Sequence, residues 1–227
     1  MIIAIQQPEH IPWLGFFDKM TKCDKFVLLD NVQFKKRYFE NRNKIRTRDD
    51  YKWVTVSVVS KARYTQVINE VEVDNYTRWK RKYWLSIVHA YSKAPYFKRY
   101  SEKFEDILKQ EWIKLVDLNV ALLKVIRNIL GITTEMIMAS CIVSENKKGS
   151  DLILSICEEL KASKYISGPD GINYLSVEEF KNSGIHIEYH RYQHPEYKQM
   201  YTPFLSHMSV VDLIFNHGEQ SLNILKN

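Results

Sequence analysis

The chain has 227 residues, of which 45% are hydrophobic and 26% are charged. A hydrophobic share of this size supplies a core and excludes an intrinsically disordered chain. No apolar run approaches the roughly 20 residues that a membrane-spanning helix needs. The three cysteines are odd in number and far apart, which fits a reducing compartment without a disulfide framework. We therefore expect a cytoplasmic protein that forms a single domain over residues 1–227.

Positive charge is concentrated in the first half of the chain. Residues 1–103 contain 21 Lys and Arg against 11 Asp and Glu, whereas the net charge of the whole chain is +6. The summed field of such a surface attracts phosphates, nucleotides or nucleic acid. A small anionic substrate is therefore an expected partner. The alternative is that these lysines and arginines only keep the surface soluble.

The first thirty residues have the pattern of a βαβ unit. Residues 2–5 (Ile-Ile-Ala-Ile) predict a buried strand, and a proline-containing loop follows at 6–12. A short helix is predicted at 13–22, before a second buried strand at 25–29. Because units of this kind normally build parallel sheets, we expect both strands to lie side by side in one.

The rest of the chain continues this alternation after two interruptions. Segments 53–59 and 67–73 alternate apolar with polar residues and predict a paired two-strand excursion. Apolar residues at helical spacing then predict a helical insert around 76–130. The βα rhythm returns afterwards, with strands predicted near 135–139, 165–167 and 185–189 and helices opening at Ser150, Ser176 and Ser209. The predicted fold class is α/β, with a mainly parallel sheet of βα units, a two-strand excursion and a helical insert.

Several separated motifs resemble one known family. They are QQPEHIPWLGFF at 6–17, VQF at 32–34, NRNKI at 41–45, WKRKYW at 79–84, YSKAPYF at 91–97, KYISGPDGINYL at 164–175, HPEY at 194–197 and SVVDLIFNHG at 209–218. In this order they resemble the WbqC-like protein family over nearly the whole chain. The resemblance implies a bacterial protein of O-antigen or related polysaccharide gene clusters, a family proposed to include glycine transferases that acylate amino sugars. We therefore expect an enzyme, an acyl or aminoacyl (glycine-type) transferase acting on an amino sugar or nucleotide-linked amino sugar.

The loop after the first strand is the first candidate site. Gln6, Gln7, His10 and Trp13 lie between a strand end and a helix N-terminus, where parallel α/β proteins bind phosphates and other ligands. The layout is similar to that of adenylyl-transferring α/β enzymes, although one His of the usual pair is missing and His10 stands where the family often has Tyr. We predict substrate binding by this loop with His10 as a candidate catalytic residue. A structural turn packed by Trp13 is the alternative.

The end of the second strand is the next candidate. Asp30 follows that strand, so its carboxylate is expected at the same edge of the sheet, where it can accept a proton from an attacking amine. Gln33, Asn41 and Arg42 fall inside the matched motifs, and an Arg can bind phosphate through two parallel hydrogen bonds. We predict Asp30 to be catalytic and the other three to bind substrate.

Two later segments complete the predicted site. Gly168 and Gly171 lie in the turn SGPDG after a strand and permit close approach of a ligand to the backbone, and Tyr174 adds a hydroxyl. His194 and Tyr197 belong to the HPEY motif, and His194 is a candidate acid or base because its pKa can be tuned near 7. A His that only stiffens the proline-containing loop is an equally open interpretation.

The sequence offers no metal site. His186, His190 and His194 would share one face of a strand, but Pro195 indicates that the strand ends earlier. The cofactor is not specified by the residues, and ATP or an activated acyl donor, such as an acyl carrier or aminoacyl donor, stays open. The alternatives are a nucleotide or nucleotide-sugar binding protein without catalysis and an adenylate-forming amide ligase. A nucleic-acid partner is not expected, because the basic aromatic stretch 76–84 has helical spacing and no nucleic-acid-binding signature accompanies it.

Overall fold

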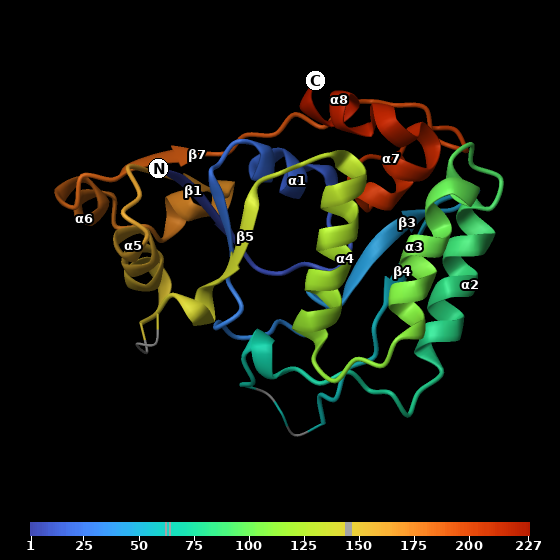
Figure 1. Cartoon of the computed structure of the whole chain (residues 1–227), viewed down its shortest axis with the longest axis horizontal. Coiled ribbons are helices and arrows are strands. Elements are labelled where there is room, and N and C mark those ends of the chain that lie inside the picture. Colours follow the sequence, from blue (N-terminus) through green and yellow to red (C-terminus); the bar gives the residue numbers. More distant parts are fainter. Residues whose placement is uncertain (62, 64, 144–146) are drawn as a thin grey trace.

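A computed structural model describes residues 1–61, 63, 65–143 and 147–227 (Figure 1). At its centre is a five-stranded sheet with the order β5-β2-β1-β6-β7, in which all neighbouring strands run parallel. The strands are β1 (Ile2–Gln6), β2 (Lys25–Leu28), β5 (Glu135–Met138), β6 (Lys164–Ser167) and β7 (His186–Tyr189). The predicted α/β class with a parallel sheet is confirmed.

Side-chain alternation along the strands divides the core between the two faces of the sheet. Phe26 and Leu28 of β2 pack into one hydrophobic cluster, while Val27 between them packs into the other. The same holds for β6, where Tyr165 and Ile166 belong to opposite clusters. Successive residues of a strand point to opposite faces, so strands that are apolar throughout can be buried on both sides.

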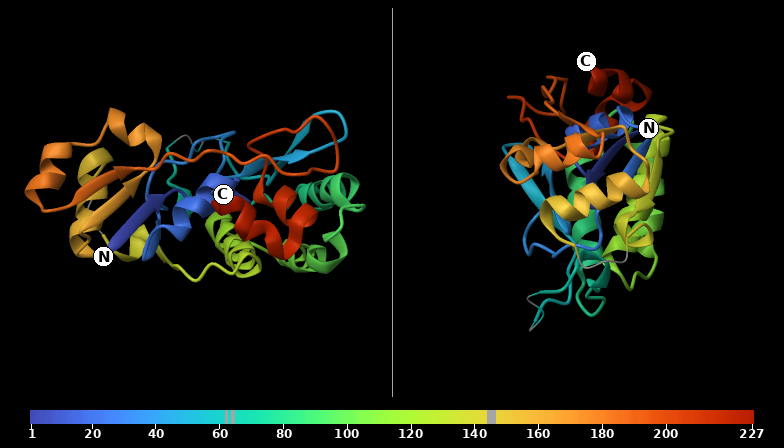
Figure 2. Two further views of the ribbon diagram at one scale, coloured as in Figure 1. Left: turned by 90° about the horizontal axis from the view of Figure 1, so that it is seen from above. Right: turned by 90° about the vertical axis from the view of Figure 1, so that its left-hand side faces the viewer.

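Helices cover both faces and extend the molecule to one side. Figures 1 and 2 show α5 and α6 near one end of the molecule, α2 and α3 at the other end, and α4 between them. The helices are α1 (Leu14–Thr21), α2 (Trp79–Tyr91), α3 (Phe97–Lys109), α4 (Leu115–Leu130), α5 (Gly149–Glu159), α6 (Val177–Asn182), α7 (Val210–His217) and α8 (Ser221–Lys226). The predicted helical insert around 76–130 is thus α2, α3 and α4. None of the described helices is long and apolar enough to cross a membrane.

The predicted two-strand excursion is confirmed, but its strands are shifted: the first predicted segment overlaps an observed strand over residues 53–55, and the second contains neither strand of the pair. The hairpin pairs β3 (Arg42–Arg46) with β4 (Tyr51–Thr55), in antiparallel register. Of the predicted pair 53–59 and 67–73, only an isolated bridge between Val58 and Val73 is present. The inward-facing side chains of β3 include the buried Asn43 as well as Ile45, so the strand lacks the apolar alternation that identifies strands in a sequence.

A long segment without regular structure returns from β7 to the last helices. In the views of Figure 2 it runs along the molecule towards the β3–β4 hairpin before α7 begins. Ser209 precedes α7 and its Oγ accepts a hydrogen bond from the backbone N–H of Val211. The same hydroxyl donates to the carbonyl oxygen of Ile11 at 2.7 Å. The segment therefore ties the C-terminal helices to the loop that follows β1.

Candidate functional site

A candidate ligand pocket adjoins the sheet at the point where the strand order reverses. The chain proceeds from β1 to β2 on one side, and β6 lies on the other side of β1. A pocket of about 400 Å³ opens at the carboxyl ends of these strands, lined by the loop after β1, by α1, by the turn after β6 and by the start of α5. Ligands of open parallel α/β sheets bind at this switch point, and the volume lies in the usual range for small-molecule sites.

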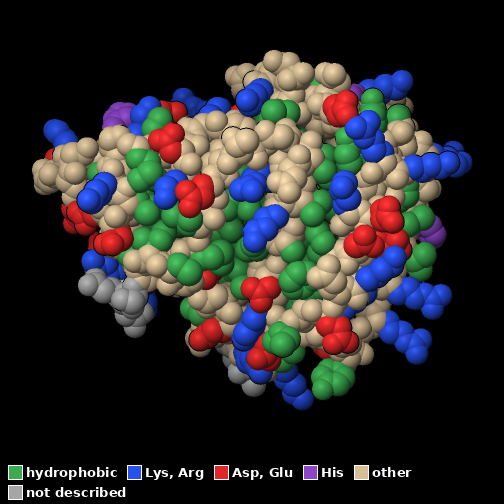
Figure 3. Space-filling view, viewed as in Figure 1, with side chains coloured by type: hydrophobic (Ala, Val, Ile, Leu, Met, Phe, Trp, Pro, Cys, Tyr) green, Lys and Arg blue, Asp and Glu red, His purple; other side chains and the backbone are tan. Residues whose placement is uncertain are grey.

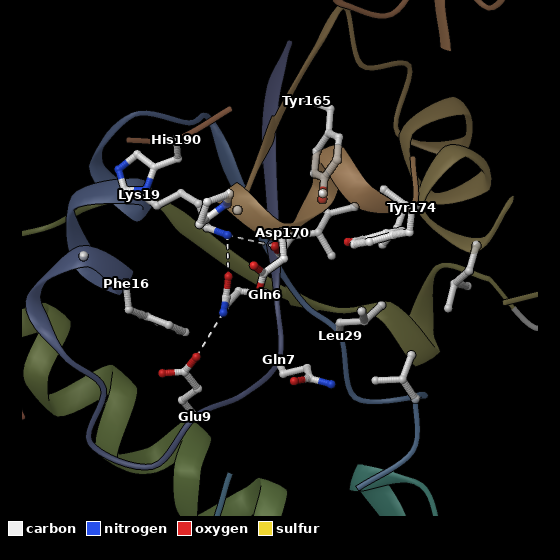
Figure 4. Close-up of a pocket in the computed structure, with 18 of the residues that line it drawn as sticks. Gln6, Gln7, Glu9, Phe16, Lys19, Leu29, Tyr165, Asp170, Tyr174 and His190 are labelled. Atoms are coloured by element: carbon white, nitrogen blue, oxygen red, sulfur yellow. Dashed lines mark hydrogen bonds between the residues drawn. The ribbon is translucent and has the colours of Figure 1, made fainter. Parts of the chain in front are cut away.

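A chain of three polar side chains crosses the floor of this pocket (Figure 4). Lys19 of α1 donates from its ammonium group to the carbonyl oxygen of Ile5 at 3.0 Å and to Oε1 of Gln6. The Gln6 amide in turn donates from Nε2 to Oε1 of Glu9 at 3.0 Å. Among the described residues, Oε2 of Glu9 has no hydrogen-bond partner although it is buried. A buried carboxylate oxygen without a donor is unusual in a folded protein and indicates a place for a ligand group.

Burial shifts the proton affinity of both charged ends of this chain. Removal from water raises the pKa of Glu9 from 4.5 to about 7, against the lowering effects of the Gln6 hydrogen bond and of Lys19. Removal from water also lowers the pKa of Lys19 from 10.5 to about 8, and the nearby Glu9 carboxylate offsets part of this change. An acid and a base that both titrate near neutral pH in one pocket are suited to proton transfer.

A second polar pair lies beside Lys19 at the edge of the pocket. His190, which follows β7, donates from Nε2 to Oδ2 of Asp18 at 2.6 Å. Asp18 also accepts from Lys22 at 2.6 Å. Burial alone would raise the pKa of Asp18, but these two donors outweigh it and hold the pKa below its ordinary value. Because the Asp18 carboxylate accepts from Nε2, Nδ1 is the ring nitrogen of His190 that remains for another contact.

The opposite wall comes from the glycine-rich turn after β6. Gly168, Gly171 and Tyr174 line the pocket together with Asp170, as Figure 4 shows for Asp170 and Tyr174. A Cβ atom on Gly171 would collide with Oγ of Ser167 and lie 2.9 Å from Leu175. The turn therefore requires glycine there because of close packing.

The loop that carries Glu9 is held in a strained conformation. Ile11 has a φ of 36°, which a β-branched residue rarely adopts. Asn43 of β3 fixes the turn by donating from Nδ2 to the carbonyl oxygens of His10 and Ile11, both at 3.1 Å. This contact gives Asn43, the second asparagine of the NRNKI motif, a structural role.

His10 itself points away from the pocket. Its Nδ1 donates to Oδ1 of Asn119 at 2.8 Å, and its Nε2 accepts from the Tyr83 hydroxyl at 2.8 Å. The direction follows from Asn119, whose Nδ2 already donates to the carbonyl oxygens of Pro8 and Glu40. Burial lowers the pKa of His10 to about 4, against a raising effect of the Asn119 hydrogen bond. A neutral, fully hydrogen-bonded His of this kind braces the loop and has no free atom for a substrate.

Asp30 is placed at the predicted edge but serves a different contact. Its Oδ1 accepts from the backbone N–H of Ser140 at 2.9 Å, and its Oδ2 accepts from the Ser140 hydroxyl at 2.6 Å and from Asn69 at 3.3 Å. The residue is 1% exposed and is not among those that line the pocket. Asp30 thus links the segment after β2 to the segment after β5 by hydrogen bonds. We therefore do not assign it the role of the catalytic base.

The three substrate-binding residues predicted after Asp30 also lie outside the pocket lining. Arg42 stacks on the indole ring of Trp53 at 4.1 Å, on the hairpin. Asn41 donates to the carbonyl oxygen of Val56 at 3.0 Å, and Gln33 forms an isolated bridge with Val67. Asp30 and Arg42 therefore do not line the pocket together with the loop after β1, contrary to the prediction.

His194 and Tyr197 form part of an aromatic cluster behind the pocket. The His194 ring stacks on Trp13, which does line the pocket, with 6.3 Å between ring centroids. Its Nδ1 donates to the carbonyl oxygen of Pro195 at 2.9 Å, and burial lowers its pKa. The Tyr197 hydroxyl donates to Oδ2 of Asp212 at 2.9 Å. Both residues support the wall that Trp13 presents to the pocket.

Of the predicted site residues, six line the pocket and seven do not. Those in the lining are Gln6, Gln7, Trp13, Gly168, Gly171 and Tyr174. Glu9, Lys19, Asp18 and His190 were missed. Glu9 stands inside the matched segment 6–17, which was the available signal for it. No feature of the sequence singled out Lys19, because a lysine in a short amphipathic helix is normally solvent-exposed. The described residues hold no cluster of three or more His, Cys, Asp or Glu that could bind a metal ion.

Fold and pocket together define the class of protein. It is an open α/β protein with a parallel sheet and a polar pocket at the switch point of that sheet. The chain belongs to the WbqC-like protein family, whose model matches residues 7–224. It is also similar to the Mycobacterium tuberculosis protein Rv1507c, itself uncharacterized, with 31% identity over 226 residues that cover 99% of this chain and 97% of that protein. No solved structure matches the chain at a significant level.

Proposed function

We propose that the protein is an acyl or aminoacyl transferase that modifies the amine of an amino sugar in its switch-point pocket. The observation that supports this most directly is the buried Oε2 of Glu9, which has no partner among the described residues and belongs to a carboxyl group with a pKa raised to about 7. A carboxylate of this kind can accept the proton that an amine loses as it attacks an acyl carbon.

The proposed reaction needs two charged groups with separate roles. The amine nitrogen of the acceptor forms a bond to the acyl carbon, Glu9 takes up the amine proton, and the bond between the acyl carbon and its leaving group breaks. The leaving group departs with the electron pair of that bond. Two N–H groups of the Lys19 ammonium donate to the protein, so the third can stabilise negative charge on the acyl oxygen.

The pocket lining supports a sugar-sized, partly charged acceptor. Trp13, Phe16 and Tyr174 offer aromatic surface, and Asp170 and Lys35 add one charge of each sign near the rim. Aromatic walls with a few polar groups are typical of pockets that orient small ligands. The substrate we propose is a nucleotide-linked amino sugar of surface-polysaccharide biosynthesis, in agreement with what the resemblance of the motifs implies.

The proposal is tested by product analysis. The protein is incubated with a nucleotide-linked amino sugar and, in separate reactions, with glycine and ATP, a glycyl thioester on an acyl carrier, and glycyl-tRNA. Mass spectrometry should find an acylated sugar nucleotide with one of these donors. Formation of AMP alongside the amide with free glycine and ATP would instead identify an adenylate-forming amide ligase.

Variants of the pocket decide whether Glu9 has the proposed role. Glu9→Gln should lower kcat at least a hundredfold while the protein stays folded, and Lys19→Met should do so with a further rise in KM. Glu159 is exposed on α5 and does not line the pocket, so Glu159→Gln is a matched control that should leave kcat unchanged. If ligand binds but no donor yields product, the protein is a non-catalytic sugar-nucleotide binder. An active Glu9→Gln variant would remove Glu9 from the mechanism.

A further inference from the structure

Two adjoining hollows lie outside the switch-point pocket, between the β3–β4 hairpin and α2. One has a volume of about 440 Å³ and the other about 370 Å³, and they share Lys52, Arg78, Lys82 and Ser86. We call the space that these two hollows form together the hairpin groove. No residue of its lining also lines the switch-point pocket. In Figure 3, Lys and Arg side chains project along the right-hand edge, where Figure 1 places α2.

The lining of the hairpin groove has one sign of charge. Lys52, Arg78, Arg81 and Lys82 contribute to it, and no Asp or Glu does. Within the described chain, none of the four Lys and Arg residues forms an ion pair. Cations held this close without a carboxylate repel one another, and a low-dielectric groove concentrates their field. An anion that enters the groove relieves that repulsion.

The start of α2 adds to this positive field. The helix begins at Trp79 without a side-chain cap and without an acidic residue in its first turn. The free backbone N–H groups of a helix N-terminus and its dipole favour an anion there and disfavour the cations that this turn carries. The arrangement is unfavourable for the isolated protein and becomes favourable with a phosphate in place.

An unpaired donor in the groove wall points to the same ligand chemistry. Trp79 is 5% exposed and lines the groove, and its Nε1 is buried without a partner among the described residues. The indole N–H can only donate, so the missing partner is an acceptor. Thr55 and Ser57 lie in the same lining, and their hydroxyls are further donors for oxygen atoms.

We propose that the hairpin groove is a second ligand site and that it binds the phosphates of a nucleoside diphosphate. The two adjoining hollows leave room for more than one phosphate. The cationic side chains and the start of α2 hold the phosphates, and the Trp79 indole N–H donates to a phosphate oxygen. This site does not depend on the reaction proposed for the switch-point pocket.

Isothermal titration with ADP, UDP and inorganic pyrophosphate tests the proposal. The double variant Arg78→Gln/Lys82→Gln should weaken pyrophosphate and nucleoside diphosphate binding at least tenfold. Lys98 and Lys103 are exposed on the neighbouring α3, so Lys98→Gln/Lys103→Gln removes the same charge from outside the groove and should change the affinity less than twofold. Trp79→Phe should weaken binding severalfold, because it removes the donor and keeps an aromatic ring.

Three results would overturn the proposal. Equal losses in the groove variant and its control would show attraction by net charge alone. Loss of pyrophosphate binding in Lys19→Met with none in Arg78→Gln/Lys82→Gln would assign the phosphates to the switch-point pocket. An RNA oligonucleotide that binds far more tightly than ADP or UDP, and is released by the groove variant, would replace the small molecule with a nucleic acid. The first two results would overturn the groove proposal without contradicting a positive result in the transferase assay. The two proposals can therefore fail separately.

Discussion

Replacement of Glu9 by Gln should stabilise the protein, and the gain should depend on pH. The pKa of Glu9 is raised from 4.5 to about 7, mainly because burial penalises its charged form. Below about pH 4.5 the carboxyl is neutral in both folded and unfolded chains, so the wild-type protein has no penalty there. As the pH rises from 4.5 to 7, the unfolded chain loses this proton before the folded chain does, and folding becomes less favourable.

The size of the effect follows from the pKa difference. One pKa unit corresponds to about 1.4 kcal/mol, so ionised Glu9 costs the folded state about 3 kcal/mol above pH 7. Gln has nearly the same shape and never ionises, and its side chain can still accept from the Gln6 amide. The free energy of unfolding of Glu9→Gln should therefore be about 3 kcal/mol higher than that of wild type at pH 8 and nearly equal to it at about pH 4.

Urea unfolding, followed by tryptophan fluorescence across this pH range, measures the difference. Only the difference between variant and wild type is compared, so all other titrating groups cancel. The exposed Glu159→Gln should give a flat difference near zero. A Glu9→Gln protein that is less stable than wild type at pH 8, or a gain that does not change with pH, would show that Glu9 is not held in the pocket as a carboxyl of raised pKa.

Three further substitutions test other parts of the site. Asp30→Ala should lower the free energy of unfolding by about 3 kcal/mol, because it removes a charged acceptor from three donors, and an unchanged urea midpoint would contradict this. Asn119→Leu should cost about 3 kcal/mol and reduce turnover together, because three buried partner atoms lose their hydrogen bonds and the loop with Glu9 loosens; full activity would separate loop order from catalysis. Gly15→Ala places a methyl group against the Trp13 ring and should shift Trp fluorescence and raise KM with little change in kcat, whereas unchanged kinetics would show that Trp13 does not contact substrate.

Much of the fold follows from local sequence patterns. Apolar runs such as residues 2–5 and 25–29 have no polar face, which suits strands buried on both sides of a parallel sheet, and the structure has β1 and β2 there. Helical spacing predicted an insert around 76–130, and α4 ends there, at Leu130, beside Gly131 with its φ of 71°. These features depend on neighbours along the chain, so a single sequence contains them.

The hairpin and the chemistry of the pocket depend on contacts between distant segments. β3 was hidden because its inward-facing Asn43 bonds to the loop after β1, a contact across more than thirty residues. Lys19 has the local pattern of a surface lysine, yet every residue of α1 from Leu14 to Met20 is buried, because other elements cover the helix on all sides.

The family, the order of the βα units and the loops at the carboxyl ends of the strands could be predicted from the amino-acid sequence, since these are properties of local pattern and motif order. Which polar groups reach the pocket, and which form hydrogen bonds elsewhere, depends on the packing of distant segments. Asp30 and His10 satisfy their hydrogen bonds with Ser140 and Asn119. Glu9 keeps an unpaired oxygen and a raised pKa, because desolvation and hydrogen-bond satisfaction are set by atoms that lie far away along the chain.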